Sequence, residues 1–261
     1  MNETYLRPTA LLDHEHPTIA ALVRTRGWSV LPESERIGAI YAFVRDEITF
    51  GYNEADTLPA SRVLADGYGQ CNTKTTLLMA LLRAAGIPCR FHGATIHKRL
   101  QRGVINGLFY AMAPASIVHS WAEVRIADRW VALEGVIIDA AYLDGIRRRH
   151  PETTGAFLGY GIGTERLAAP PIEWRGGDTF IQKTGVDRDH GLFDDPDAFY
   201  ARHGGNLAGL KAWLYRTWIR HVMNRNVERI RRCGGNPGCT TAATARAWGR
   251  RGTAALPRPP Q

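Results

Sequence analysis

Residues 61–90 read SRVLADGYGQCNTKTTLLMALLRAAGIPCR, and this stretch decides the fold. Two glycines and a glutamine lead directly into Cys71, and a leucine-rich run follows. The leucines between positions 77 and 82 have helical spacing and their neighbours are also apolar, so we expect a buried helix. Gly86 and the proline after it end that helix, and the alternation over residues 89–96 predicts a strand.

A cysteine at the start of a buried helix has a particular chemistry. The first turn of a helix has N–H groups without partners and a partial positive charge, which favours thiolate over thiol. The same N–H groups can bind a developing oxyanion. A free cysteine is most often a small buried hydrophobe, and Cys89 fits that role. Cys71 follows a glycine-rich approach and is therefore the candidate nucleophile.

The composition is that of a soluble globular protein. The chain has 261 residues, of which 44% are hydrophobic, enough for a sizeable core. It contains no run of about 18 apolar residues, and its first 13 residues lack the apolar centre of a signal peptide. We therefore expect a cytoplasmic protein with no membrane partner. The four cysteines lack zinc-type spacing, so neither a disulfide framework nor a metal site is predicted, and no cofactor is expected.

The formal net charge of +8 is concentrated toward the C-terminal end of the chain. Residues 207–231 have helical periodicity, with basic side chains on one face and an apolar stripe that should dock on the core. No nucleic-acid-binding motif accompanies these basic residues, so nucleic acid is not the expected partner. Residues 233–261 are rich in Gly, Ala, Arg and Pro and are predicted to be disordered. The apolar stripe consists of Leu207, Leu210, Leu214, Trp218 and Val222.

Residues 118–134 predict a β-hairpin. Two alternating runs flank a two-residue turn at positions 127–128. In the register set by that turn, one face of the hairpin is almost wholly apolar. The opposite face carries His119, and Glu134 is its diagonal neighbour on the second strand, within reach of a long side chain.

These residues supply a nucleophile, a base and a group that orients the base. A catalytic Cys needs a His within hydrogen-bond reach, and that His needs an acid to fix its tautomer and ring plane. The sequence therefore predicts Cys71, His119 and Glu134 as the catalytic set. Asp139 remains the alternative acid, because a bulge near Gly135 could turn it inward. A one-residue slip of the hairpin would also exchange the acids, but it would destroy the apolar face.

Several motifs in the same order resemble the transglutaminase-like superfamily. They are Gly69-Gln70-Cys71 before the leucine-rich helix, the helix stop at residues 83–90, and the two strands at residues 119–124 and 130–134. The resemblance covers roughly residues 32–145. It implies a papain-like α+β fold, in which the helix carrying Cys71 packs against an antiparallel sheet carrying the His and the acid.

The resemblance also implies the chemistry. Members of that superfamily include crosslinking transglutaminases, bacterial cysteine proteases, peptide N-glycanase-like amidases and amide-forming enzymes. The usual acid at the position of Glu134 is Asp, and residues 72–74 are more polar here than is usual in the family. Neither calcium nor another cofactor is predicted.

We expect one transglutaminase-like domain over residues 1–232, with its core at 32–145 and a helical extension at 197–232. The expected function is cleavage or transfer of an amide or acyl group on a peptide, a protein or a small substrate, through a Cys71 thioester. Two alternatives come from other classes of function. One is a non-catalytic binding module on the same fold, and the other is a basic scaffold for nucleic acid. The sequence fixes neither the substrate nor the oligomeric state.

Overall fold

Helix α4 (Cys71–Ala84) occupies the centre of the fold. The computed structural model describes residues 3–207 and 209–232, and within it every residue from position 71 to position 83 is buried. The predicted helix is thus confirmed, and it is covered on all sides as its apolar composition requires. Gly86, with a φ of 78°, follows its last turn, as expected of a helix stop.

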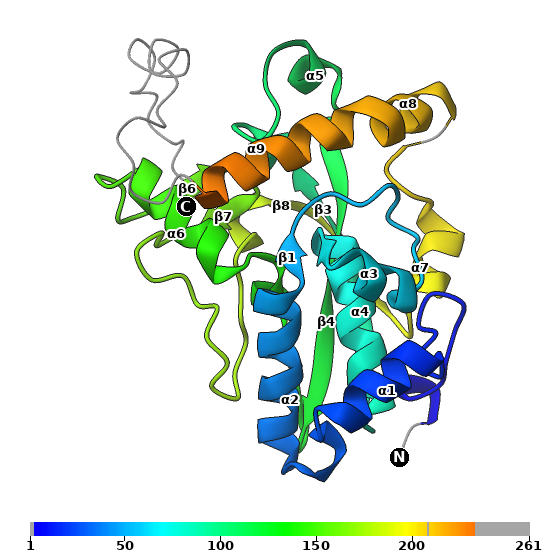
Figure 1. The fold of residues 1–261 in the computed structure, drawn as a ribbon. Helices are drawn as coiled ribbons and strands as arrows, with labels where there is room; N and C mark the ends of the chain where they lie inside the picture. Colours follow the sequence, from blue (N-terminus) through cyan, green and yellow to red (C-terminus); the bar gives the residue numbers. More distant parts are fainter. Residues whose placement is uncertain (1–2, 208, 233–261) are drawn as a thin grey trace, which may run out of the picture.

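The main sheet packs against α4. It is antiparallel, with the strand order β5-β4-β3-β8, and β4 (Ser116–Ile126) is the strand that lies against the helix. Its neighbours are β3 (Cys89–His97), β5 (Arg129–Ala132) and the edge strand β8 (Val186–Phe193). Helices α1 (Pro17–Thr25), α2 (Glu33–Ala42) and α3 (Ala60–Asp66) also contact α4, which therefore lies between helices and sheet (Figure 1). The architecture is α+β, as predicted.

The β4–β5 hairpin has the predicted register. Val124 pairs with Val131, and the Leu133 N–H donates to the Ala122 carbonyl at 2.8 Å. The second strand is shorter than predicted, because β5 ends at Ala132 and the chain then turns into η5 (Glu134–Ile137), a 3-10 helix. The acid at position 134 therefore projects from a turn and not from a strand.

Strand β8 was not predicted. Its four central polar or charged residues follow one another and a glycine comes next, so the sequence lacks the apolar alternation that predicts a strand. Side chains hold it in place: Asp187 Oδ2 accepts from Ser116 Oγ at 2.7 Å, and Asp189 Oδ1 pairs with His92 Nε2 at 2.8 Å. The register also shifts twice along β3. Tertiary contacts thus determine this strand.

The C-terminal helix differs from the prediction. It consists of α8 (Gly209–Leu214), a π-helical turn η7 (Tyr215–Ile219) and α9 (Arg220–Arg232). The predicted stripe does not dock, because Leu210 is 77% exposed and Trp218 is 67% exposed. A π turn adds a residue to the helical repeat and so rotates the faces on either side of it. The buried side chains beyond the turn are Met223, Val227 and Ile230.

No helix of the described residues is long and apolar enough to cross a membrane. The tail predicted to be disordered, residues 233–261, lies outside the described residues. The division of the chain into one domain with an extension stays a prediction.

Shorter elements complete the fold. The remaining strands and helices are β1 (Thr49–Phe50), β2 (Tyr68–Gly69), β6 (Phe157–Gly159), β7 (Ile162–Thr164), α5 (Gly107–Met112), α6 (Ala140–Arg149), α7 (Pro196–His203), η1 (Glu3–Tyr5), η2 (Trp28–Val30), η3 (Phe43–Glu47), η4 (Lys98–Gln101) and η6 (Lys183–Gly185).

Candidate active site

Cys71 is the first residue of α4, as predicted, and the residues before it are fixed by short contacts. The Gln70 N–H donates to Thr73 Oγ1 at 3.1 Å, and Gln70 Oε1 accepts from the Asn53 N–H at 2.8 Å. Gly69 approaches the helix so closely that a Cβ there would lie 2.8 Å from Thr73 Oγ1. A larger residue would push the chain off the helix, so this glycine permits the sharp entry into α4.

The thiol itself is 7% exposed. Burial raises the pKa of Cys71, and the charges of Asp56 and Glu134 raise it further, against the N–H groups of Asn72 and Ser120, which lower it. The N–H groups at the helix start lower the pKa of Cys71 as expected, but burial raises it more. At a buried thiol, the cost of desolvating the charged form outweighs the field of one helix. A free thiolate needs a cation beside it.

His119 and Glu134 form a buried pair. His119 lies on β4 and is fully buried, and its Nε2 is 3.0 Å from Glu134 Oε1. The sequence predicted this pairing from the diagonal register of the hairpin, although the acid comes from η5. The Nδ1 atom of His119 is buried and has no hydrogen-bond partner among the described residues. The ring therefore has one nitrogen held by an acid and one nitrogen without a partner.

Backbone groups outside the predicted motifs hold Glu134. The N–H of Ile181 donates to Oε2 at 2.5 Å, and the N–H of Gln182 is 3.0 Å from both carboxylate oxygens. The chain reaches them through Thr179, whose carbonyl accepts from the N–H groups of Glu134 and Gly135. Sequence analysis missed these residues, since backbone donors in an irregular segment leave no side-chain signal. They give the buried carboxylate the hydrogen-bond donors that burial would otherwise deny it.

Asn72 ties the nucleophile helix to the strand of His119. Its Nδ2 donates to the Val118 carbonyl at 3.1 Å, and its Oδ1 accepts from Ser120 Oγ at 2.9 Å. These partners are the two chain neighbours of His119. The residue directly after Cys71 thus binds both sides of the histidine, which fixes helix and strand relative to each other.

Residues 73 and 74 are also structural. Thr73 Oγ1 donates to Asn53 Oδ1 at 2.6 Å, and Lys74 Nζ donates to the Arg45 carbonyl at 3.0 Å. Lys74 is fully buried, and this burial lowers its pKa to about 7. The polar side chains that follow Cys71 therefore make hydrogen bonds within the protein interior.

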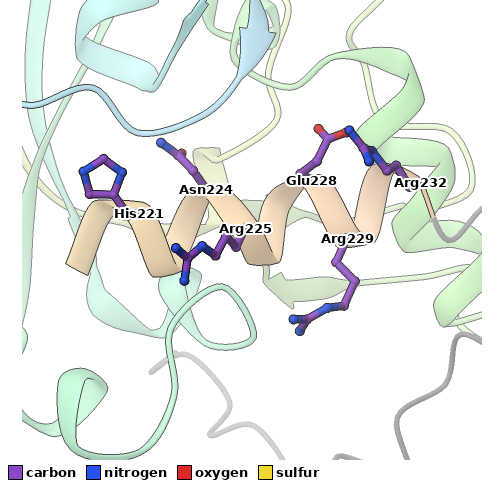
Figure 2. A pocket seen from close by; sticks show the side chains of 6 residues that line it. All are labelled: His221, Asn224, Arg225, Glu228, Arg229 and Arg232. Atoms are coloured by element: carbon purple, nitrogen blue, oxygen red, sulfur yellow. The ribbon is translucent and has the colours of Figure 1, made fainter. Parts of the chain in front are cut away.

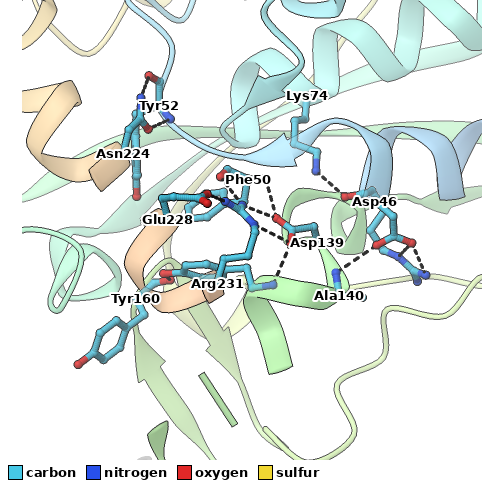
Figure 3. A network of polar contacts seen from close by, with 12 residues as sticks. Asp46, Phe50, Tyr52, Lys74, Asp139, Ala140, Tyr160, Asn224, Glu228 and Arg231 are labelled. Carbon is cyan, nitrogen blue, oxygen red and sulfur yellow. Dashed lines mark hydrogen bonds and ion pairs between the residues drawn. The ribbon is translucent and has the colours of Figure 1, made fainter. Parts of the chain in front are cut away.

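Asp139, the alternative acid, is engaged elsewhere. It caps α6 by accepting from the Tyr142 N–H at 2.8 Å, and it accepts from the Phe50 N–H at 2.8 Å. Arg231 of α9 pairs with it at 2.8 Å, as Figure 3 shows. Burial raises the pKa of Asp139, but Arg231 and the two N–H groups outweigh this effect and lower it. Asp139 anchors the C-terminal helix and is not the partner of His119.

Segments beyond α7 cover the site. Asn206 Oδ1 accepts from the Val118 N–H at 2.6 Å, and Asn206 Nδ2 donates to Asp56 Oδ2 at 2.8 Å. Tyr215 of η7 donates to the Asn53 carbonyl at 3.2 Å, and burial, followed by the charge of Asp56, raises the pKa of Tyr215. These contacts hold the segment beyond α7 against residues near Cys71 and His119.

A second histidine, His92 on β3, lies on the same sheet. This ring stacks on Trp121 at 4.1 Å between centroids and pairs with Glu123 and Asp189, each at 2.8 Å. Both ring nitrogens are thereby occupied. His119 differs from it in keeping one nitrogen without a partner.

Residues 24–135 match the model of the transglutaminase-like superfamily. The matched segment includes all three predicted catalytic residues and ends before α6, so the segments that cover the site lie outside it. No curated protein matches the chain.

Among solved structures, the chain is similar to a "putative cysteine protease" from Cytophaga hutchinsonii, with 12% identity and a TM-score of 0.42, over 74% of this chain and 47% of that one. It is similar to red sea bream transglutaminase, with 20% identity and a TM-score of 0.28, over 38% of this chain and 21% of that one. It is also similar to a "putative protease" from Parabacteroides distasonis, with 16% identity and a TM-score of 0.31, over 50% and 24%. The chain thus spans less than half the length of each, and these distant similarities assign no reaction.

Proposed function

Because residues 24–135 of the chain belong to the transglutaminase-like superfamily, we propose that this protein is a cysteine-dependent enzyme that cleaves or transfers an amide or related acyl group. The observation that carries the proposal is the buried pair of His119 and Glu134 beside the helix that begins with Cys71. A histidine that is held at Nε2 and without a partner at Nδ1 is prepared to exchange a proton at Nδ1.

The proposed reaction begins at the thiol. The Sγ of Cys71 attacks the substrate carbonyl carbon while its proton passes to Nδ1 of His119. The N–H of Cys71, at the first position of α4, donates to the developing oxyanion. When the tetrahedral intermediate collapses, the carbon–nitrogen bond breaks, the leaving amine takes the proton from His119, and a thioester remains on Cys71. Water or a second amine then attacks the thioester and restores the thiol.

Glu134 has a supporting role in this scheme. Its carboxylate accepts the Nε2–H of His119, which fixes the tautomer and stabilises the imidazolium that forms during each transfer. The N–H groups of Ile181 and Gln182 keep the carboxylate in place. The raised pKa of Cys71 makes this assistance necessary, because a buried thiol gives up its proton only when a base receives it.

The burial of Cys71 favours one other function. A module that binds a partner without catalysis would also tolerate a covered thiol with a raised pKa. The two functions differ in how Cys71 reacts.

Alkylation by iodoacetamide near neutral pH separates them. The proposal predicts that the peptide containing Cys71 is alkylated faster than the peptide containing Cys89, and that a His119→Ala variant reacts about 100-fold more slowly, at the low end of what a catalytic base contributes. The His92→Ala variant is the matched control and keeps the wild-type rate. Equal alkylation rates of Cys71 in wild type and His119→Ala would contradict the enzyme proposal and favour the binding module.

A further inference from the structure

The C-terminal helix (α8, η7 and α9, residues 209–232) exposes large apolar side chains that no described residue covers. Leu210, Trp213 and Trp218 are 77%, 48% and 67% exposed. Helix α5 has no buried residue, and Leu108 and Met112 on it are 74% and 50% exposed. Scattered exposed apolar residues are ordinary, but several large ones gathered at one end of a molecule mark an interaction surface.

These two elements lie at the same end of the molecule. Figure 1 shows α5, α8 and α9 at the end opposite α1 and α2. A direct contact joins the C-terminal helix to the loop before α5, since Asn226 Nδ2 donates to the Val104 carbonyl at 2.8 Å. Both elements therefore present their exposed apolar residues at the same end of the molecule.

The same region is strongly basic. Residues 97–117 contain three Lys or Arg and no Asp or Glu, and residues 204–232 contain seven Lys or Arg and a single acid, Glu228. Glu228 pairs with Arg231 and Arg232 on its own helix. Arg225 and Arg229 form no ion pair with any described residue, and Figure 2 shows them extending from α9 on the side away from Glu228.

The basic and apolar residues share the outer face of the C-terminal helix. We call it the Trp/Arg face and define it by Leu210, Trp213, Trp218, His221, Arg225 and Arg229, all of which are exposed. Its first half is apolar and its second half is basic. A shallow hollow on α9, lined by His221, Asn224, Arg225, Glu228, Arg229 and Arg232, borders this half (Figure 2).

We propose that the Trp/Arg face and α5 bind a membrane surface rich in anionic phospholipid. Tryptophan and leucine side chains enter the boundary between headgroups and acyl chains, and arginines beside them bind the lipid phosphates. Aliphatic residues such as Leu108, Met112 and Leu210 gain nothing from a nucleic-acid backbone, which needs cations alone, so the apolar component favours lipid. The sequence-based expectation of no membrane partner rested on the lack of a spanning run, and a helix that lies on the surface needs no such run.

The test is co-sedimentation of the full chain with vesicles of equal parts phosphatidylcholine and phosphatidylglycerol, compared with phosphatidylcholine alone. The proposal predicts binding to the anionic vesicles that weakens with added salt. An Arg225→Gln/Arg229→Gln variant should bind about 25-fold more weakly, at about fivefold for each basic residue. A Trp213→Ser/Trp218→Ser variant should also lose at least about tenfold.

Matched controls come from the opposite end of the molecule. Arg24→Gln/Arg175→Gln removes the same charge, and Val30→Ser removes an apolar side chain that is 87% exposed. Both should bind like wild type, as should Cys71→Ala, so this result does not depend on the proposed enzyme function. Equal binding to both vesicle types would overturn the proposal, and so would unchanged binding of the tryptophan variant. Binding to a single-stranded oligonucleotide with none to vesicles would assign the surface to nucleic acid instead.

Discussion

The Nε2 atom of His119 lies 3.0 Å from Oε1 of Glu134, and both side chains are buried. An unpaired carboxylate would be unstable in such a place, but this one also accepts from two backbone N–H groups. The hydrogen bond therefore holds the imidazole ring of His119 in one orientation.

Glu134→Gln tests that relationship. The new amide would direct N–H donors at the N–H of Ile181 or Gln182, or at His119, so at least one buried donor loses its acceptor. We expect the free energy of unfolding to fall by about 1–3 kcal/mol and the alkylation of Cys71 to slow by at least about tenfold. Asp139→Asn is the control, since it breaks the pair with Arg231 without touching His119. A slower alkylation in Asp139→Asn than in Glu134→Gln would contradict the assignment of the acid.

The pH dependence of Cys71 should change when the histidine is removed. Burial raises the pKa of this thiol, so in His119→Ala the alkylation rate should be low at neutral pH and climb above the range of a free thiol, about 8.5. In wild type the rate should level off at a lower pH, because protonated His119 stabilises the thiolate. Rate profiles between about pH 6 and pH 10 check this. Superimposable profiles would show that the imidazole does not assist the thiol.

The cover over the site should open when its hydrogen bonds are removed. Asn206→Ala loses the bonds to Val118 and Asp56, and Tyr215→Phe loses the bond to Asn53. At about 1 kcal/mol for each bond, each change should raise the labelling of Cys71 by a bulky maleimide about fivefold or more. Thr217→Ala, which removes only a bond within the helix, is the control. Labelling that is the same in all four proteins would show that this segment does not limit access.

Lys74 should make stability depend on pH. Burial lowers its pKa in the folded protein to about 7, below its value of about 10.4 in an unfolded chain. Between these values the unfolded chain binds the extra proton, so wild-type stability should rise with pH by up to about 1.4 kcal/mol per unit. Lys74→Met removes this pH dependence. The free energy of unfolding of the variant should exceed that of wild type most below about pH 7, and the difference should shrink above it.

Urea unfolding at about pH 6, 8 and 9.5 measures the effect of Lys74. Lys211→Met, at an exposed position on α8, is the control and should show the same pH dependence as wild type. If the difference between Lys74→Met and wild type stayed constant across this range, the lysine would not titrate inside the protein.

Local patterns in the sequence predicted the centre of the fold. The leucine spacing gave α4, and the two-residue turn gave the hairpin register and the diagonal approach of Glu134 to His119. Strand β8 could not be predicted, because its polar residues reveal their role only beside β3 and β4.

The rest of the site depends on contacts far apart in the chain. The N–H groups of Ile181 and Gln182 meet Glu134 across more than forty residues, and backbone donors have no residue type to recognise. The docking face of the C-terminal helix was predicted incorrectly because the π turn η7 changes its phase. The sequence showed the helix start, whose N–H groups lower the pKa of Cys71, but not the depth of burial, which raises this pKa more.

The most direct test of the account is a stoichiometric burst with p-nitrophenyl acetate. If Cys71, His119 and Glu134 act as one unit, the wild-type protein should release one equivalent of nitrophenolate rapidly, and mass spectrometry should find a single acetyl group on Cys71. Cys71→Ala should give no burst, and His119→Ala should acylate about 100-fold more slowly or worse. Acetyl groups spread over lysines, with the same release from Cys71→Ala as from wild type, would contradict the claim that these residues form a catalytic site.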